Sequence, residues 1–293
     1  MKKLTALLIG VFILCGGLAV AVAQDSEATM PPPKVLTVFR EFVKPGKVGT
    51  IHEKSESAFV QAMAAAKWPT HYLGMDSVSG KQRSLFLTGY DSFDALEKDT
   101  KAVGKNATLS AALDRASAAD GELLTESDNY VLMYREDQSL NANVDIPHMR
   151  YFEISVYQVR PGHMNDWNEA VKLVMAAYEK IPDVHWAMYQ EVYGQVDTEF
   201  VVFTPLKSAA EIDQGFTRDK EFMANMGEDG MKKLAELEAA GIESVQHNLF
   251  AFNPKESYVG EDWIKADPDF WKPKSSMPMH MKKKMEEKPS GSQ

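Results

Sequence analysis

An internal repeat is the feature that most restricts how this 293-residue chain can fold. Shifting the sequence by 116 residues aligns VKPGK, which begins at Val43, with VRPGH, which begins at Val159. A Pro-Gly pair ends an extended segment, because proline cannot donate to a strand ladder and glycine tolerates turn conformations. In both places a segment with helical periodicity follows. The sequence therefore predicts two copies of one supersecondary unit.

Each copy continues through the same series of elements. Second extended segments lie at 70–75 and 184–189, third strands at 84–90 and 199–204, second helical regions after 92 and 208, and closing strands at 130–134 and 247–252. This β-α-β-β-α-β order is the ferredoxin-like arrangement. We therefore predict an α+β protein with two tandem ferredoxin-like domains, at 34–140 and 149–254, joined by a linker at 141–148. A linker at 24–33 precedes them and a tail at 255–293 follows.

The strand–Pro-Gly–helix opening, the strand order and the duplication together resemble the dimeric α+β-barrel group, which includes antibiotic-biosynthesis-monooxygenase-like and NIPSNAP-like domains. The resemblance covers residues 34–254. It implies that two sheets pair face to face into a barrel, and we expect them to pair within one chain as a pseudo-dimer; a homodimer is the alternative. Members range from cofactor-free oxygenases and haem-handling enzymes to domains without known activity, so the fold does not decide the function.

The first 23 residues are typical of an export signal. Lys2 and Lys3 precede an apolar core, and the small-residue sequence AVA at 21–23 suits cleavage. We expect an exported chain, periplasmic or secreted, that is not membrane-bound after cleavage. Cleavage lowers the 32 basic residues to 30 against 42 acidic ones, so the formal net charge falls from −10 to −12, which disfavours nucleic acid as a partner. Cys15 is the only cysteine, so the mature chain has no disulfide or catalytic thiol.

The first strand of each copy has one apolar and one mixed face, because side chains alternate along a strand. We expect the apolar faces, such as Leu36 and Val38, to meet the helices, and the mixed faces to line the barrel interior. The mixed faces supply six candidate ligand-binding residues: Thr37, Phe39, Glu41, Glu153, Ser155 and Tyr157. Carboxylates and hydroxyls in a partly dry cavity suit ligand contacts. Alternatively, the sheets stay open and this face is solvated.

Two histidines occupy matching positions in the two copies. His71 is followed by Tyr72, and His185 by Trp186. A neutral imidazole in a cleft can act as a general base, a haem ligand or a proton shuttle, with the aromatic neighbours as ligand contacts. The alternative is structural: each imidazole bonds a neighbouring carbonyl and packs beside a ring.

Strong metal motifs are absent from the sequence, since no two of the seven histidines lie three to five residues apart. We predict no resident cofactor; haem and Cu(I) are the minor alternatives. Thioethers and an imidazole suit Cu(I), and the tail offers Met277, Met279, His280 and Met281, although its composition is also typical of a disordered end. Earlier in the tail, Trp263, Phe270 and Trp271 are expected to dock on the barrel wall, over a cavity mouth.

These observations favour an exported barrel protein that binds a small apolar or aromatic molecule in the barrel interior, without demonstrated catalysis. The first alternative is a cofactor-independent monooxygenase-like or haem-handling enzyme, with His71 or His185 as the base. The second alternative is a protein-interaction module.

Overall fold

The computed structural model describes residues 29–194 and 198–272. The predicted export signal and the Met-His segment at 277–281 lie outside these residues. Within them, no helix is both long and apolar enough to cross a membrane.

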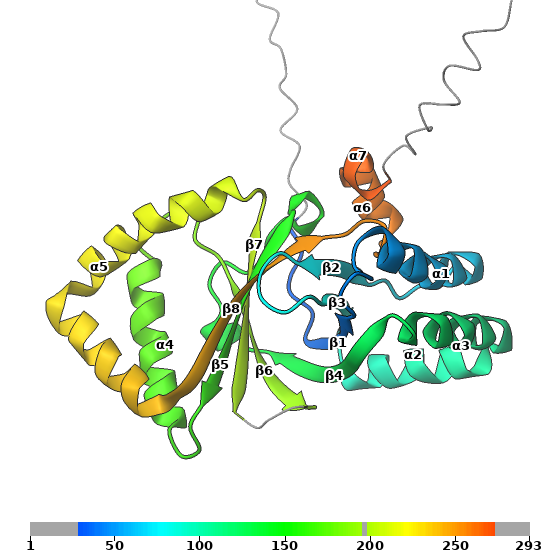
Figure 1. Ribbon diagram of the computed structural model, residues 1–293. Coiled ribbons are helices and arrows are strands. Elements are labelled where there is room, and N and C mark those ends of the chain that lie inside the picture. The colour runs from blue at the N-terminus through cyan, green and yellow to red at the C-terminus, as the bar shows by residue number, and fades with distance from the viewer. Residues whose placement is uncertain (1–28, 195–197, 273–293) are drawn as a thin grey trace, which may run out of the picture.

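Eight antiparallel strands close into one barrel (Figure 1). They are β1 (Val35–Val43), β2 (Leu73–Ser77), β3 (Ser84–Tyr90), β4 (Leu124–Tyr134), β5 (Tyr151–Val159), β6 (Ala187–Tyr193), β7 (Glu199–Leu206) and β8 (Ile242–Phe252). The order around the ring is β1-β3-β2-β8-β5-β7-β6-β4. Each half therefore contributes four neighbouring strands, and the pairs β2–β8 and β4–β6 join the halves. The predicted fold class is confirmed: this is an α+β barrel consistent with a ferredoxin-like pseudo-dimer closed within one chain.

The helices lie outside the barrel, with α1–α3 on one side and α4 and α5 on the other (Figure 1). Their bounds are α1 (Thr50–Ala66), α2 (Phe93–Lys105), α3 (Ala107–Gly121), α4 (Met164–Tyr178), α5 (Ala210–Gly241), α6 (Glu261–Ala266) and α7 (Pro268–Trp271), with short 3-10 turns η1 (Glu136–Gln138) and η2 (Ile146–His148). The repeated Pro-Gly pairs lie in the turns before α1 and α4. Gly46 and Gly162 have φ of 80° and 87°, a left-handed conformation that favours glycine.

The barrel interior holds the main hydrophobic core. Alternate residues of all eight strands meet there, including Leu36, Val38, Leu132, Ile154 and Phe250. Leu132 and Phe250 are almost completely buried. Packing density in such a core leaves little open volume, so the middle of the barrel is filled by its own side chains.

The assignment of strand faces from sequence was therefore reversed. Leu36 and Val38 point into the barrel, whereas Glu41 on the opposite face contacts His52 of α1. In the second half the ring of Tyr157 packs 5.3 Å from that of Trp167 on α4. The physical reason is that a closed barrel buries its inner face most completely, so the more uniformly apolar face turns inward. The amphipathic helices then cover the mixed face.

Candidate functional site

A cavity of about 760 Å³ opens at one end of the barrel, next to the filled core. Its floor is formed by inward-pointing core residues, among them Leu36, Phe152 and Phe203. Its walls come from three short segments that precede strands: 31–34 before β1, 69–72 before β2 and 185–186 before β6. Segment 259–263, which includes the start of α6, residues 89–91 at the end of β3, Ala95 of α2 and residues of the 142–146 connection form the rest of the wall. A cavity of this size suits a drug-sized molecule.

The two repeated histidines both line this cavity. Because each lies two residues before the second strand of its half, the pseudo-symmetry of the closed barrel brings them to the same end. His185 Nε2 lies 2.9 Å from the carbonyl oxygen of Pro205, so that imidazole is held by the backbone. The ring of His71 lies 4.9 Å from the ring of Tyr258, and its nitrogens make no hydrogen bond with a described residue. His185 therefore matches the alternative in which the imidazole bonds a neighbouring carbonyl. The ring nitrogens of His71, in contrast, are available to a ligand.

The aromatic residues that follow these histidines both line the cavity, but their polar atoms are bonded differently. Trp186 lines the cavity while its indole Nε1 donates to the carbonyl of Gln138 at 2.9 Å, which fixes the ring. Tyr72 also lines the cavity, but its ring packs edge-on against Phe86 at a centroid distance of 6.0 Å. The Tyr72 hydroxyl is buried and bonds no described residue. Burial and nearby carboxylates, Glu56 first, raise the pKa of Tyr72.

The three aromatic residues of the C-terminal segment pack against the barrel core, as expected, but of the three Trp263 alone lines the cavity. Trp263 lines it and packs against Trp271, with ring centroids 5.1 Å apart. Trp271 is buried in the barrel core cluster, and its Nε1 donates to the carbonyl of Pro147 at 2.8 Å. An ion pair between Arg150 and Asp267 holds the same segment. These contacts fix α7 against the barrel core, and α7 in turn holds α6, whose Asp262 and Trp263 belong to the cavity wall.

The charges around the cavity are few. Lys34 is the one lysine or arginine among its described lining residues, and it is outnumbered by Asp91 and Asp262. The lining is otherwise apolar, aromatic or uncharged apart from the two histidines. An anionic ligand would therefore find little compensation there, and a neutral one is favoured.

The six candidates from the mixed strand faces do not line the cavity. Thr37 Oγ1 donates to the carbonyl of Thr88, and Ser155 Oγ lies 2.8 Å from Nδ1 of His247. Phe39 is 39% exposed. Glu153 and Tyr157 lie on the same outer face of β5, which turns toward α4 and α5, as Tyr157's contact with Trp167 shows. The structure therefore separates these residues from His71 and His185.

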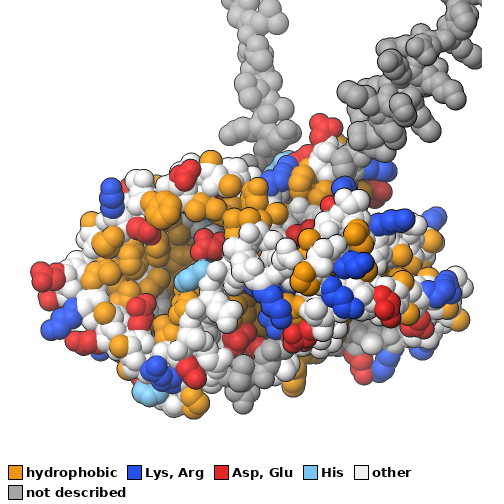
Figure 2. Space-filling view, viewed as in Figure 1, with side chains coloured by type: hydrophobic (Ala, Val, Ile, Leu, Met, Phe, Trp, Pro, Cys, Tyr) orange, Lys and Arg blue, Asp and Glu red, His pale blue; other side chains and the backbone are white. Residues whose placement is uncertain are grey.

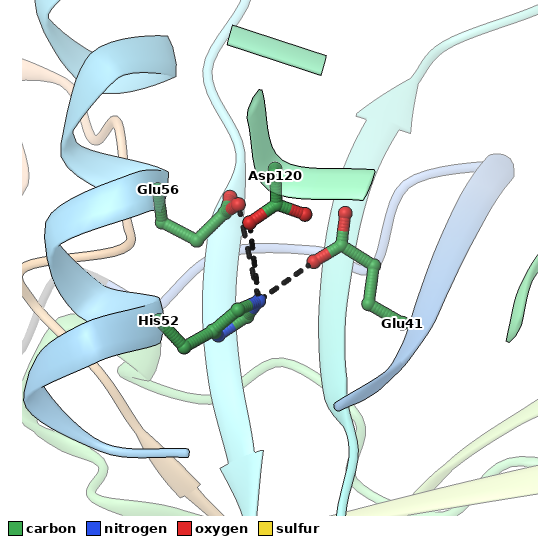
Figure 3. A group of neighbouring side chains, drawn as sticks. All are labelled: Glu41, His52, Glu56 and Asp120. Atoms are coloured by element: carbon green, nitrogen blue, oxygen red, sulfur yellow. Dashed lines mark hydrogen bonds and ion pairs between the residues drawn. The ribbon is translucent and has the colours of Figure 1, made fainter. Parts of the chain in front are cut away.

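Glu41 belongs to a second site, a buried cluster of carboxylates around His52 (Figure 3). His52 Nε2 lies 3.1 Å from Glu41 Oε2, 3.7 Å from Asp120 Oδ1 and 4.0 Å from Glu56 Oε1. Three elements supply these side chains: Glu41 comes from β1, His52 and Glu56 from α1, and Asp120 from α3. The ligand atoms of all four residues lie within 4.8 Å of one another.

The other nitrogen of His52 faces a different set of groups. Nδ1 lies 3.5 Å from Glu256 Oε1 and 3.4 Å from Ser84 Oγ. Ser84 in turn donates to Asp76 at 2.6 Å, and Asp76 also accepts from Asn253 Nδ2 at 2.8 Å. Glu256 and Asn253 follow β8, so the end of the second half completes a site whose other members belong to the first half.

Burial makes this cluster electrostatically unusual. His52, Asp120 and Glu256 are each 1% exposed, and Glu41 and Glu56 are 3% exposed. Burial alone would lower the pKa of His52, but hydrogen bonds to Glu256 and Glu41 outweigh it and raise that pKa to about 11. Burial, followed by the charges of Glu41 and Asp120, raises the pKa of Glu56 to about 10. Burial raises the pKa of Glu256 to about 7, against the opposing hydrogen bond with His52.

The sequence contained one signal for this cluster that was missed. His52 and Glu56 lie four residues apart on a helix, which places both side chains on one face. Spacing between histidines does not reveal the cluster, because its histidine is paired on the helix with a carboxylate. Asp120 and Glu256 are remote in sequence, so only the fold brings them to His52.

An apolar hollow marks the opposite half of the molecule, over α4, α5 and β8 (Figure 2). Among the exposed apolar side chains of these elements are Phe216, Met223 and Val245. A protein-interaction module, the second alternative from sequence, would use a surface of this kind.

No family model matches the chain, and no curated protein sequence does. Solved structures are similar in fold. A candidate monooxygenase from Fusobacterium nucleatum has 13% identity and a TM-score of 0.48 over 76% of this chain and 94% of its own. An anthrone oxidase-like protein has 15% identity and a TM-score of 0.48 over 75% and 92%. A mutant chlorite dismutase from Candidatus Nitrospira defluvii has 10% identity and a TM-score of 0.42 over 83% and 99%.

These likenesses concern the fold, and no activity follows from them.

Proposed function

We propose that the chain is exported and that it binds a small, neutral, apolar or aromatic molecule in the cavity at the open end of its barrel. The observation that carries this proposal is the cavity itself, about 760 Å³ in volume, with an apolar floor and aromatic walls fixed by hydrogen bonds. Because the walls are held in place by Trp186 and the docked α6–α7 segment, binding costs little ordering entropy. His71 supplies the one imidazole of the cavity whose nitrogens bond no described residue, and it fixes the orientation of a ligand with a hydroxyl or carbonyl.

Binding is tested with the chain lacking residues 1–23 and with 1-naphthol, a neutral aromatic probe. Trp186 and Trp263 line the cavity, so occupancy changes their fluorescence. Ala187→Phe places a ring in the cavity, and we expect it to weaken naphthol binding at least about tenfold, because overpacking is not relieved in a rigid site. Ala65→Phe, on the exposed side of α1, is the matched control and leaves the affinity unchanged. Equal affinities for the two variants, or no saturable quenching in the unaltered chain, would refute the cavity as the binding site.

A second candidate function is proton abstraction from a bound phenol or activated C–H group, as a cofactor-independent oxygenase requires. The observation that favours it is the uncommitted imidazole of His71 at the cavity. In this case a bound anthrone or naphthol gives up a proton to His71 and reacts with O2 from air to form the corresponding quinone and one water, and His71→Gln abolishes the quinone while retaining binding. If the bound ligand is recovered with unchanged mass, the enzymatic function is refuted and the binding function stands.

Haem fits the described cavity poorly. His71 offers an axial nitrogen, but the haem propionates require cations, and Lys34 is the one lysine or arginine of the described lining, beside Asp91 and Asp262. We therefore assign no haem step to this site.

A further inference from the structure

The four side chains drawn in Figure 3 have the geometry of a metal site. One imidazole nitrogen and the oxygens of three carboxylates converge from β1, α1 and α3, with all ligand atoms within 4.8 Å of one another. Ligands that share one ion at about 2.1 Å lie up to about 4.2 Å apart. The most widely separated of these atoms must therefore approach one another by roughly 0.6 Å or more to share one ion, a movement that side-chain rotation provides.

Unsatisfied oxygens provide a second and independent observation. Glu56 Oε1 and both carboxylate oxygens of Asp120 are buried and accept no hydrogen bond in the described structure. Buried carboxylates are normally paired or bound to metal, because an uncompensated charge in a dry site is costly. Among the ion pairs of the described residues, none brings a lysine or arginine to Glu56, Asp120 or Glu256. Within residues 29–194 and 198–272, His52 is thus the one side-chain cation paired with several of these carboxylates.

The other side of the imidazole has the arrangement found around metal-bound histidines. A histidine that binds metal through one nitrogen usually donates its second N–H to a carboxylate, which fixes the tautomer and the ring orientation. Here Nε2 faces the three carboxylates, and Nδ1 faces Glu256 at 3.5 Å. Asp76 and Ser84 complete this outer set, with Ser84 Oγ 3.4 Å from Nδ1.

We propose that Glu41, His52, Glu56 and Asp120 bind one divalent first-row transition-metal ion, with Glu256 orienting His52. Imidazole suits Mn²⁺, Fe²⁺ and Zn²⁺ better than Mg²⁺ or Ca²⁺, and a carboxylate-rich set favours Mn²⁺ among them. The site is closed on all sides and has four protein ligands, which is typical of a structural ion. It ties β1 to α1 and α3. This inference is independent of ligand binding in the barrel cavity.

The test uses the full chain, stripped of metal with EDTA and titrated with MnCl₂. We expect one Mn²⁺ per chain by loss of the free-ion EPR signal, a raised thermal midpoint, and a single ¹⁴N coupling from imidazole in pulsed EPR. Mg²⁺ at the same concentration does not displace Mn²⁺, and Zn²⁺ does. The proposal is overturned if neither Mn²⁺ nor Zn²⁺ binds stoichiometrically, or if bound Mn²⁺ shows no ¹⁴N coupling. The carboxylates of the cluster are then neutralised by protons.

Variants locate the ion. Glu56→Gln and Asp120→Asn each remove one ligand with little change in shape, and we expect Mn²⁺ affinity to fall by about 100-fold or more, since even outer partners are worth about 10–100-fold. Glu53→Gln, on the same helix and paired with Lys255 at the surface, is the matched control. Equal affinity in Glu56→Gln, Asp120→Asn and Glu53→Gln would place the ion elsewhere and overturn the site.

A further variant tests the site even if substitution of a metal-binding residue prevents folding. Glu256→Gln keeps all four ligands, so we expect it to retain the ¹⁴N coupling and to bind Mn²⁺ about 10–100-fold more weakly. Unchanged affinity in Glu256→Gln would refute the orienting role of this residue.

Discussion

The contact between Gly74 and the segment after β8 provides the sharpest test of how the two halves are joined. A Cβ atom at Gly74 would lie 2.5 Å from the carbonyl oxygen and 2.9 Å from the carbonyl carbon of Glu256. Both atoms belong to the backbone, so no side chain can rotate away. Gly74→Ala must therefore push the segment that carries Glu256 outward from β2, by close to an ångström.

The energetic cost follows from what this displacement breaks. Gly74 N donates to Ser257 Oγ at 2.9 Å, and Gly74 O accepts from Asn253 N at 2.9 Å. Overpacking in a rigid interior costs about 1–3 kcal/mol, and each weakened hydrogen bond costs about 1 kcal/mol. Alanine also lowers the conformational entropy of the unfolded chain, which restores about 0.5 kcal/mol of the free energy of unfolding. We expect Gly74→Ala to lower the free energy of unfolding by about 3 kcal/mol.

Urea denaturation followed by tryptophan fluorescence measures this loss directly. The matched control is Gly215→Ala in α5, where a Cβ meets no atom within 4 Å and the φ is negative. That control should be neutral or stabilising by up to about 1 kcal/mol, because alanine favours a helix. A Gly74→Ala variant as stable as Gly215→Ala would show that the segment after β8 does not pack on β2 as described. It would then also remove Glu256 from the proposed orienting role.

Two further predictions concern the core and pH. Leu132→Ala, at a fully buried position in the barrel interior, should lower the free energy of unfolding by about 2–5 kcal/mol and leave a single urea transition, since this core is shared by both halves; two separate transitions would contradict a shared core. Burial and the carboxylate of Glu191 raise the pKa of Glu199 to about 7, so its contribution to stability is full below about pH 4.5 and is lost as pH rises through 7. Glu199→Gln should therefore be more stable than the unaltered chain at pH 8. Its thermal midpoint should also depend less on pH between 5 and 8. Identical pH profiles for the two proteins would refute the raised pKa of Glu199.

Much of the fold could be predicted because turn residues mark where the segments of each repeat end. The Pro-Gly pairs and the alternating segments between them located the strands and the first helix of each half. The starts of β2 and β6 were placed three residues early, since His71 and His185 lie in the connecting segment and not in the strand. The second helical region of the first half contains two helices, α2 and α3, because Asn106 ends the first and caps the second with its side chain.

The candidate site was predicted only in part, for a physical reason. His71, His185, Tyr72 and Trp186 were found because the repeat places them at matching points, and a symmetric barrel brings matching points to one end. The direction of the strand faces is different: alternation divides the two faces but does not say which one turns inward. That choice depends on closure of the sheet, so Glu41 was expected in the barrel and lies instead beside His52.

Closure of the barrel also affects the timing of folding. The first half exposes the edges of β2 and β4 until β8 and β6 pair with them, and β8 ends at Phe252, close to the end of the described chain. During synthesis from the N-terminus, the first four strands therefore emerge long before the strand that covers β2 exists. An uncovered strand edge is a template for pairing with other chains, so the nascent first half should be the aggregation-prone species of this protein. Its final contacts, including those of Glu256 with His52, become available only when almost the whole chain has been made.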